Sequence, residues 1–284
     1  LKLYETGYRF ESNERARVYL TNALDKPKDF SGTFTFAIPA LANEARAVNQ
    51  IKRNTCFTVI IGNPPYSLVS SNMLPMHRDL VKRYKFIGKR AIEERGALQL
   101  EKILNDDYVK FIAKSEALIS KSGAGVVGLI TNHAYIDNPT MRGMRHSLLT
   151  TFELRYICNL HGSSKKVVDL TDENVFDIQQ GVSVGIFLKL PDKKPKGINY
   201  SQLRGSRKSK LQTLSNLIVS DMKNDILQPT APSFLFSYFN TDLWQEYERF
   251  SSLTEIFPLR SIGLFTSKDS LVIDQDKNKV LRRV

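Results

Sequence analysis

Apolar runs alternate with helix-patterned stretches along the middle of the chain. Residues 57–61 (Phe-Thr-Val-Ile-Ile) form a mostly β-branched run that stops at Gly62, and residues 126–131 and 154–160 form two similar runs. Such runs are typical of parallel strands that are buried on both faces. Between them, apolar side chains in residues 108–119 recur at helical spacing. This order predicts a doubly wound α/β fold with a mostly parallel sheet.

The segments that follow predict one more helix and a smaller antiparallel element. Asn138 and Pro139 suit the N-cap and first turn of a helix that continues to about residue 149. Residues 182–190 alternate between apolar and polar side chains, as a strand does. We expect this strand to pair with residues 198–200 and to form a C-terminal antiparallel hairpin.

Three further segments complete the predicted organisation. Residues 17–21 alternate as a short strand, and the polar, basic residues 80–104 favour a helical insertion. The pattern of apolar and polar residues changes after about residue 250, where residues 262–266 and 271–273 have the pattern of short strands. We therefore predict one domain at residues 1–250 and the start of a second at residues 251–284.

Charge narrows the choice of partner. The chain has 41 Lys and Arg against 29 Asp and Glu, a formal net charge of +12, and such an excess favours a polyanion such as nucleic acid. Five basic side chains gather in a short stretch and are candidates for contact with DNA phosphates: Lys82, Arg83, Lys85, Lys89 and Arg90. The alternative is a basic face that contacts only solvent.

The sequence lacks the patterns typical of membrane proteins, secreted proteins and metal sites. No apolar stretch reaches the roughly 18 residues that a membrane span needs, and no secretory signal pattern is found, so we expect a cytoplasmic protein. The 2 cysteines and 4 histidines show no metal-ligand spacing. We therefore expect no metal.

Asn63-Pro64-Pro65-Tyr66, directly after the first apolar run, carries the sharpest chemical signal. An exocyclic amine is a poor nucleophile until acceptors for its two protons draw the nitrogen toward tetrahedral geometry. The side-chain oxygen of Asn63 and the carbonyl of Pro64 supply two acceptors, and the prolines hold the turn rigid. Tyr66 then stacks on the base. The structural alternative is an ordinary Pro-Pro turn that ends a strand.

Several segments together resemble the methyltransferase part of single-chain restriction–modification enzymes of types IIG and ISP. These proteins join nuclease, methyltransferase and target-recognition domains, and type ISP adds a helicase. The resemblance covers about residues 5 to 275 and implies a methyltransferase sheet. It rests on residues 63–66, 107–112, 131–133, 138–145, 160–162 and 172–182.

The resemblance also implies roles for individual residues. Residues 63–66 match motif IV, which holds the target adenine. Phe176 matches the motif VIII aromatic that packs against the flipped base, although its position alone favours a core residue. Residues 21–24 look like motif III, which places Asn22 and Leu24 at the adenine of S-adenosylmethionine. The family often has Asp where this chain has Asn22.

Two family motifs are not found in this sequence. The glycine-rich motif I and the acidic motif II that grips the cofactor ribose are expected before Leu1, so we expect this fragment to bind S-adenosylmethionine weakly. Residues 262–269 resemble the opening of a target-recognition domain. The implied partners are double-stranded DNA and the nuclease domain, with a helicase in type ISP, of the same polypeptide.

The function that follows is site-specific adenine-N6 methylation of DNA by a restriction–modification enzyme. Two alternatives stay open on the residues alone. The same motif suits RNA adenine or a protein glutamine, because any planar amide or amidine nitrogen needs the same acceptors. A non-catalytic DNA-binding module with a vestigial motif is the other alternative.

Overall fold

The computed structural model describes residues 2–11, 16–27, 39–66, 70–92, 102–164, 171–219, 225–238, 243–247, 249–259 and 276–283. It divides into two compact units, Leu1–Tyr238 and Phe239–Val284. The described helices of the first unit are α1 (Lys2–Glu5), α2 (Pro39–Asn54), α3 (Pro75–Leu80), α5 (Asp107–Ser122), α6 (Arg142–Thr151) and α7 (Arg207–Asn216). Single 3-10 turns are η1 (Lys82–Lys85), η2 (His133–Ile136) and η3 (Pro139–Met141).

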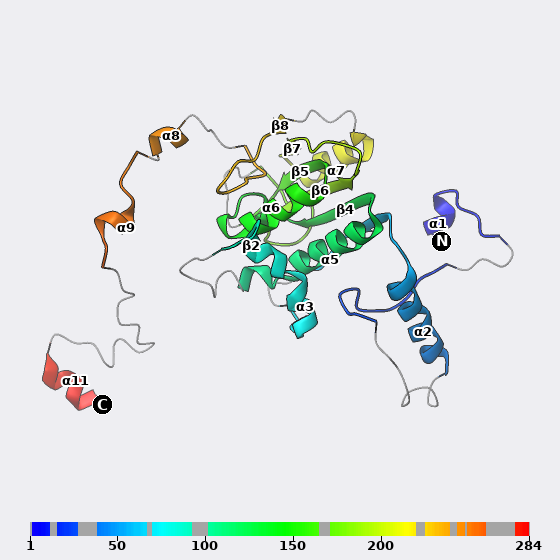
Figure 1. The fold of residues 1–284 in the computed structure, drawn as a ribbon, viewed down its shortest axis with the longest axis horizontal. Coiled ribbons are helices and arrows are strands. Elements are labelled where there is room, and N and C mark those ends of the chain that lie inside the picture. Colours follow the sequence, from blue (N-terminus) through cyan, green and yellow to red (C-terminus); the bar gives the residue numbers. More distant parts are fainter. Residues whose placement is uncertain are drawn as a thin grey trace. The chain divides into compact units, whose positions relative to one another are not determined.

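A six-stranded mixed sheet forms the centre of the first unit (Figure 1), in the order β1-β4-β6-β5-β7-β8. β1 pairs with β4 in parallel, and β5 pairs with β7 in parallel. β6 lies between β4 and β5 and is antiparallel to both, and β8 is antiparallel to β7. β1, β4, β5 and β7 therefore run in one direction. The strands are β1 (Val59–Gly62), β4 (Gly125–Asn132), β5 (Leu154–His161), β6 (Val182–Lys189), β7 (Ile198–Gln202) and β8 (Asp225–Leu227).

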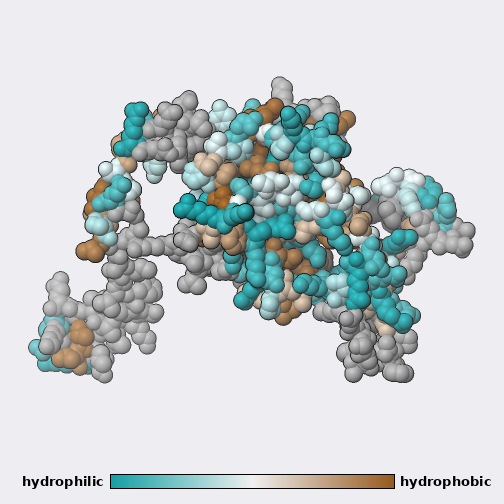
Figure 2. Space-filling view, in the orientation of Figure 1, coloured by the Kyte–Doolittle hydropathy of each residue, from teal (hydrophilic) through white to brown (hydrophobic). Residues whose placement is uncertain are grey.

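Two hydrophobic clusters cover the two faces of this sheet. Val127 and Leu129 of β4 belong to the larger cluster, which also contains buried side chains of α5 and α6, whereas Ile130 packs on the second cluster. Because neighbouring side chains of a strand point to opposite faces, the two clusters lie on opposite sides. α5 and α6 cover the first face (Figure 1), and hydrophilic side chains dominate the outer surface there (Figure 2).

The α/β class is confirmed, but the predicted sheet is wrong in two respects. The sheet is only partly parallel, because β6 inserts in the reverse direction between β4 and β5. The predicted hairpin does not form, since residues 198–202 pair with β5 and not with β6. An alternating pattern fixes which side chains face each side of a sheet, but it does not fix which strand is the neighbour.

Three local predictions also differ from the structure. Residues 17–21 form no strand. The described part of the segment predicted as a helical insertion, residues 80–92 and 102–104, is helical only at Leu80, the last residue of α3, and at residues 102–104; between them lie η1 and a small hairpin of β2 (Phe86–Ile87) and β3 (Arg90–Ala91). β1 is an edge strand of the described sheet, and Val59 and Ile61 are 58% and 82% exposed, although their apolar run predicts burial on both faces.

The second unit contains three short described helices, α8 (Trp244–Tyr247), α9 (Leu253–Ile256) and α11 (Lys277–Arg283). α9 begins with a capping box, in which Ser252 and Glu255 each accept a hydrogen bond from the other's backbone N–H. The strands predicted at residues 262–266 and 271–273 lie outside the described residues. None of the described helices has the length and apolar character that a membrane span requires.

Candidate active site

One edge of the sheet brings together the ends of four neighbouring strands. β1, β4 and β5 end at this edge because they run in the same direction, and the antiparallel β6 begins there. Asn63 follows β1, His133 follows β4, His161 ends β5 and Gly181 precedes β6. The His133 N–H donates to the Gly181 carbonyl at 3.0 Å. The carboxyl edge of parallel strands is where open α/β sheets bind ligands.

The Asn-Pro-Pro-Tyr segment leaves β1 at this edge. Gly62, the last residue of β1, pairs with Leu129 of β4, and a Cβ atom on Gly62 would lie 3.2 Å from Leu129 Cδ2, so a side chain there would be tightly packed. Asn63 and Pro65 are exposed, Pro64 is buried and Tyr66 is half-buried. The segment therefore anchors itself through one proline and leaves the Asn63 side chain open to solvent at the sheet edge.

Tyr66 and Phe176 lie side by side although they are far apart in the sequence. Their ring centroids are 5.7 Å apart, and the ring planes are inclined by 56°. Both rings pack on the second hydrophobic cluster, which contains Leu160 and Val182. Burial raises the pKa of Tyr66 to about 12, and its hydroxyl is buried with no hydrogen-bond partner among the described residues. A neutral phenol ring therefore faces Phe176.

Asn174 holds the loop that carries Phe176. Its Nδ2 atom lies within donating distance of the carbonyls of Gly162, Ile178 and Gln180, at 2.9, 3.1 and 2.7 Å. Its Oδ1 atom accepts from the Phe176 N–H at 3.0 Å. One side chain thus closes the loop on itself and fastens it to the end of β5. Sequence reasoning gave Asn174 no separate role, because an asparagine in a polar loop carries no distinguishing pattern.

A buried ion pair supports the same loop from the opposite side. Lys210 of α7 lies 2.7 Å from Asp172, and their side chains are 0% and 8% exposed. The Lys210 ammonium also donates to the carbonyls of Leu160 and Glu173, at 2.7 and 2.6 Å. Burial by itself would raise the pKa of Asp172, but hydrogen bonds from Lys210 and from two backbone N–H groups outweigh it and lower that pKa.

The two histidines at the sheet edge are tied into the same region. His133 Nδ1 lies 3.1 Å from Asn159 Oδ1, and His161 Nε2 lies 3.0 Å from Gln202 Oε1. Burial lowers the pKa of His161. Both rings therefore have polar partners, as a structural interpretation of these histidines expects.

The chain that follows the motif is anchored to the start of α5. Asp107 Oδ1 accepts from Ser70 Oγ at 2.5 Å and from Asn72 Nδ2 at 3.0 Å. The Lys110 ammonium donates to Ser70 Oγ and to the Asn72 carbonyl, at 2.8 and 2.7 Å. Asp107 and Lys110 are both buried. Residues 70–72 are thus fixed soon after the candidate base-holding motif.

The residues matched to the cofactor lie near this anchor but fit a cofactor only in part. Asn22 Nδ2 donates to Asn72 Oδ1 at 2.7 Å, and Asn22 Oδ1 accepts from the Leu24 N–H at 3.0 Å. Leu24 is 1% exposed. The Asn22 side chain is therefore occupied by the protein, and the Leu24 side chain is closed to a ligand.

The five basic residues of the predicted phosphate cluster occupy two different settings. Lys82, Arg83 and Lys85 belong to η1, whereas Lys89 lies in the turn of the β2–β3 hairpin and Arg90 begins β3. Arg83 pairs with Glu116 at 3.3 Å, and the Glu116 side chain is 0% exposed. Glu116 also accepts from Tyr84 Oη at 2.8 Å. Part of the Arg83 guanidinium group therefore pairs with a buried carboxylate, so Arg83 also has a structural role.

The mixed sheet is that of a methyltransferase-like α/β domain, with the Asn-Pro-Pro-Tyr turn at its carboxyl edge. The chain belongs to the Eco57I restriction-modification methylase family, whose match spans residues 9–167. This finding confirms the resemblance on which the sequence-based prediction rests.

Individual relatives agree with the family. Type II methyltransferase M.BstVI from Geobacillus stearothermophilus is 30% identical over 111 residues, which are 38% of this chain and 16% of that protein. The structure of the ATP-dependent Type ISP restriction-modification enzyme LlaBIII bound to DNA matches 93% of this chain with 26% identity and a TM-score of 0.66. A nuclease-deletion mutant of the Type ISP enzyme LlaGI, in complex with a DNA substrate mimic, matches 86% of this chain with 22% identity and a TM-score of 0.64, and so shows the fold.

This chain is short beside these proteins. It spans 18% of LlaBIII and 24% of LlaGI.

Proposed function

We propose that this chain is the part of a restriction–modification enzyme that holds a flipped adenine of double-stranded DNA for methylation at N6. One observation carries the proposal. The Asn-Pro-Pro-Tyr segment leaves the carboxyl end of β1 with its asparagine exposed, and its tyrosine ring lies 5.7 Å from Phe176. Hydrogen-bond acceptors and aromatic surface thus adjoin at the edge where an α/β sheet binds ligands.

Asn63 and Pro64 supply the acceptors in this proposal. The adenine amino group donates one proton to the Asn63 side-chain oxygen and the other to the Pro64 carbonyl, and the nitrogen lone pair is then less delocalised into the ring. No general base is needed before transfer, because the proton leaves after the nitrogen has become cationic. Catalysis rests on positioning and on fixed dipoles.

Tyr66 and Phe176 supply adjoining walls rather than two sides of a sandwich. A base between two parallel rings needs about 7 Å between them, twice the usual contact distance of about 3.5 Å. The observed 5.7 Å and the 56° inclination leave no such gap. Tyr66 therefore stacks on the face of the base, and Phe176 closes a neighbouring side and retains the base outside the duplex.

The family implies S-adenosylmethionine as the methyl donor. The described residues give no complete site for it, since the Asn22 side chain is hydrogen-bonded to Asn72 and Leu24 is buried. Double-stranded DNA is the proposed substrate, because LlaBIII and LlaGI were solved with DNA or a DNA mimic. We also propose that nuclease and helicase domains belong to the same polypeptide, and that the enzyme acts in the cytoplasm.

Substitution of Asn63 in the complete enzyme tests the acceptor role. Asn63→Ala removes one fixed hydrogen-bonding group from the reacting nitrogen, which costs about 10²-fold or more in rate. DNA affinity stays within about twofold, because Asn63 holds no phosphate. Single-turnover methylation and DNA binding are measured on the same preparations, with Asn216→Ala, an exposed asparagine at the end of α7, as the control. Methylation of RNA or of a protein glutamine, with none on DNA, would contradict the proposal.

Substitution of Phe176 in the same enzyme tests base retention. Because Phe176 contacts the side of the base and does not stack on it, its loss is expected to cost about 1 kcal/mol, the lower end of the range for stacking, so Phe176→Ala shifts the flipped base back into the duplex by about fivefold. A 2-aminopurine at the target position fluoresces when unstacked and reports this equilibrium. Unchanged fluorescence with Phe176→Ala shows that Phe176 is only a core residue.

A further inference from the structure

The connection between β5 and β6 runs from Gly162 to Gly181 and carries Phe176. We infer that Asn174 is a positioning residue for retention of the flipped base: its carboxamide fixes the place of the Phe176 ring, and it acts on the base only through that ring. This inference rests on the proposed function and deepens it, since Phe176 is there the wall that keeps the adenine outside the duplex.

The Asn174 carboxamide ties both ends of this connection to its middle. Its Nδ2 atom donates to the Gly162 carbonyl at 2.9 Å on the β5 side and to the Gln180 carbonyl at 2.7 Å on the β6 side. A third carbonyl, that of Ile178, lies 3.1 Å from the same atom. The Oδ1 atom accepts from the Phe176 N–H at 3.0 Å. The backbone of Phe176 is thus linked through one side chain to both neighbouring strands.

The contacts at this position require an asparagine. The three carbonyls need a donor and the Phe176 N–H needs an acceptor, which together fix the orientation of the amide. An ionised aspartate has no proton to donate, and a serine hydroxyl has only one. Replacement of Asn174 by either residue therefore loses at least part of the link between Phe176 and the two strands.

Two glycines allow the connection to lie this close to the sheet edge. A Cβ atom on Gly162 would collide with the Asn174 backbone, and the φ angle of Gly162 is 76°, which suits glycine. A Cβ atom on Gly181 would collide with the ring of His133, whose backbone N–H donates to the Gly181 carbonyl at 3.0 Å. Both ends of the connection are therefore held against the sheet, and the place of Phe176 between them depends on Asn174.

The ion pair of Lys210 with Asp172 stabilises the same connection in a different way. The Lys210 ammonium contacts Asp172 and two carbonyls, and all three groups precede Asn174 in the sequence. The Asn174 carboxamide instead contacts the Phe176 backbone directly. Loss of Lys210 therefore lowers the stability of the chain, whereas loss of the Asn174 carboxamide releases Phe176 from its place.

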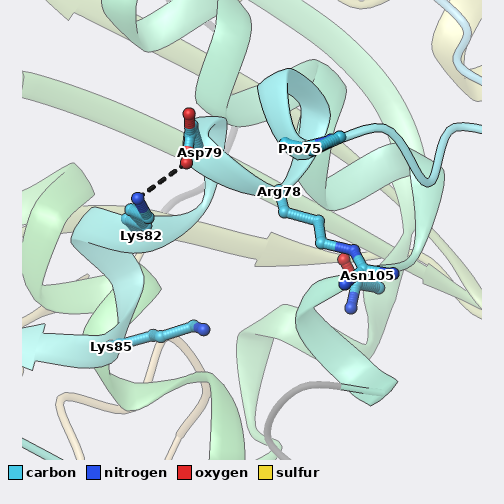
Figure 3. Close-up of a pocket in the computed structure, with 6 residues that line it drawn as sticks. All are labelled: Pro75, Arg78, Asp79, Lys82, Lys85 and Asn105. Atoms are coloured by element: carbon cyan, nitrogen blue, oxygen red, sulfur yellow. Dashed lines mark ion pairs between the residues drawn. The ribbon is translucent and has the colours of Figure 1, made fainter.

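The cavity shown in Figure 3 takes no part in holding the base. It has a volume of about 540 Å³, and Asp79 and Lys82 form an ion pair there at 2.7 Å. Its described lining consists of Pro75, Arg78, Asp79, Lys82, Lys85 and Asn105. None of these residues belongs to residues 63–66 or to the connection that carries Phe176. Retention of the base therefore depends on where the rings of Tyr66 and Phe176 lie, and on the contacts that fix them.

Fluorescence of 2-aminopurine tests the inference on the complete enzyme, with a duplex that carries this base at the target position. Phe176→Ala lowers the flipped fraction about fivefold. We expect Asn174→Ala to lower it by at least about threefold, because the ring remains but the hydrogen bonds that fix its place are lost. The double variant Asn174→Ala/Phe176→Ala is expected to agree with Phe176→Ala within about twofold, because Asn174 acts only through that ring.

The matched control is Asn138→Ala. Asn138 is half-buried like Asn174, and its Oδ1 atom accepts from the Thr140 N–H, two residues ahead, at 2.9 Å, as Asn174 Oδ1 accepts from the Phe176 N–H. We expect this control to leave the flipped fraction unchanged. Asn174→Ser keeps an acceptor for the Phe176 N–H, so it is expected to retain more of the fluorescence than Asn174→Ala. Thermal melting verifies that every variant is folded.

The outcomes separate this inference from the proposed function. Wild-type fluorescence in Asn174→Ala, with a fall in Phe176→Ala, would overturn the positioning role and leave the proposed function standing. A double variant that loses the product of the two single effects, about 15-fold, would show that Asn174 acts independently of Phe176 and would overturn it as well. An equal loss in Asn138→Ala would show a general effect of stability, with the same consequence. No fluorescence increase with the wild-type enzyme, or no change in Phe176→Ala, would refute base retention by Phe176 and with it both statements.

Discussion

Lys210 is a charged side chain that the fold has taken completely out of water. Removing an ammonium group from water costs several kcal/mol, and the cost is recovered only when hydrogen bonds and an opposite charge meet it. Lys210 has all of these, because Asp172 lies 2.7 Å away and two carbonyls accept from it. The interaction joins α7 to the loop that carries Phe176, so one residue links helix packing to the candidate base site.

We predict that Lys210→Met destabilises the chain strongly. The substitution leaves the Asp172 carboxylate buried without its partner, which costs about 3–5 kcal/mol of unfolding free energy. Lys208→Ala on the same helix is the control, because Lys208 is exposed and such changes stay within about 0.5 kcal/mol. Urea unfolding measures both. Equal stability of the two variants means that the buried pair does not support the loop.

The same pair predicts a pH dependence. The pKa of Asp172 is lower in the folded chain than in the unfolded chain, because the hydrogen bonds from Lys210 and the backbone outweigh burial. Its contribution is therefore present above the unfolded pKa of about 3.9 and is lost as the pH falls through the folded pKa. The stability difference between wild type and Asp172→Asn is expected to be constant near neutral pH and to narrow below about pH 4. A constant difference down to pH 2 would contradict it.

At the level of elements, the sequence pattern of β6 predicts where the strand begins and ends but not which strands lie beside it. Its span agrees with the predicted strand, because alternation over residues 182–190 is a local property. Its neighbours in the sheet differ from the predicted ones, because insertion between β4 and β5 depends on contacts with residues that are far away in sequence. The helix expected from the spacing of residues 108–119 forms as α5, residues 107–122, because helical spacing is also a local property. It ends at Gly123, whose φ angle of 84° suits glycine.

α6 and η1 pack so closely that a single methyl group is expected to separate them. A Cβ atom on Gly143 would collide with the Tyr84 carbonyl oxygen and would lie 2.8 Å from Ile92 Cδ1. Gly143→Ala gains about 1 kcal/mol of helix propensity but is expected to lose more by overpacking, which costs about 1–3 kcal/mol or beyond where backbone is hit. Thermal unfolding measures the net loss. Gly128→Ala has no atom within 4 Å of the new Cβ and is the control, so greater damage by Gly128→Ala would refute the packing argument.

For the molecule as a whole, the sequence motif and the charge pattern each identify only some residues of the candidate site. Residues 63–66 are recognisable because a rare tetrapeptide follows a strand, and Phe176 is recognisable only through the family resemblance. Asn174, Asp172 and Lys210 carry no local signal, since their importance comes from a loop folding back onto β5. The basic cluster is visible as composition, but only the fold shows that Arg83 pairs with buried Glu116.

Cofactor binding depends on the whole of this chain. Within its 284 residues the sequence shows neither the glycine-rich loop nor the acidic ribose-binding residue of the family, and the matched Asn22 and Leu24 are occupied or buried. We expect S-adenosylmethionine to bind this chain weakly or not at all, whereas the same preparation still binds DNA in a salt-dependent way, because the chain has a formal net charge of +12. Isothermal titration calorimetry with S-adenosylmethionine decides the first part and anisotropy the second. Micromolar affinity for the cofactor would contradict this expectation, and a change of that affinity in Asn72→Ala would place the cofactor beside the hydrogen bond between Asn22 and Asn72.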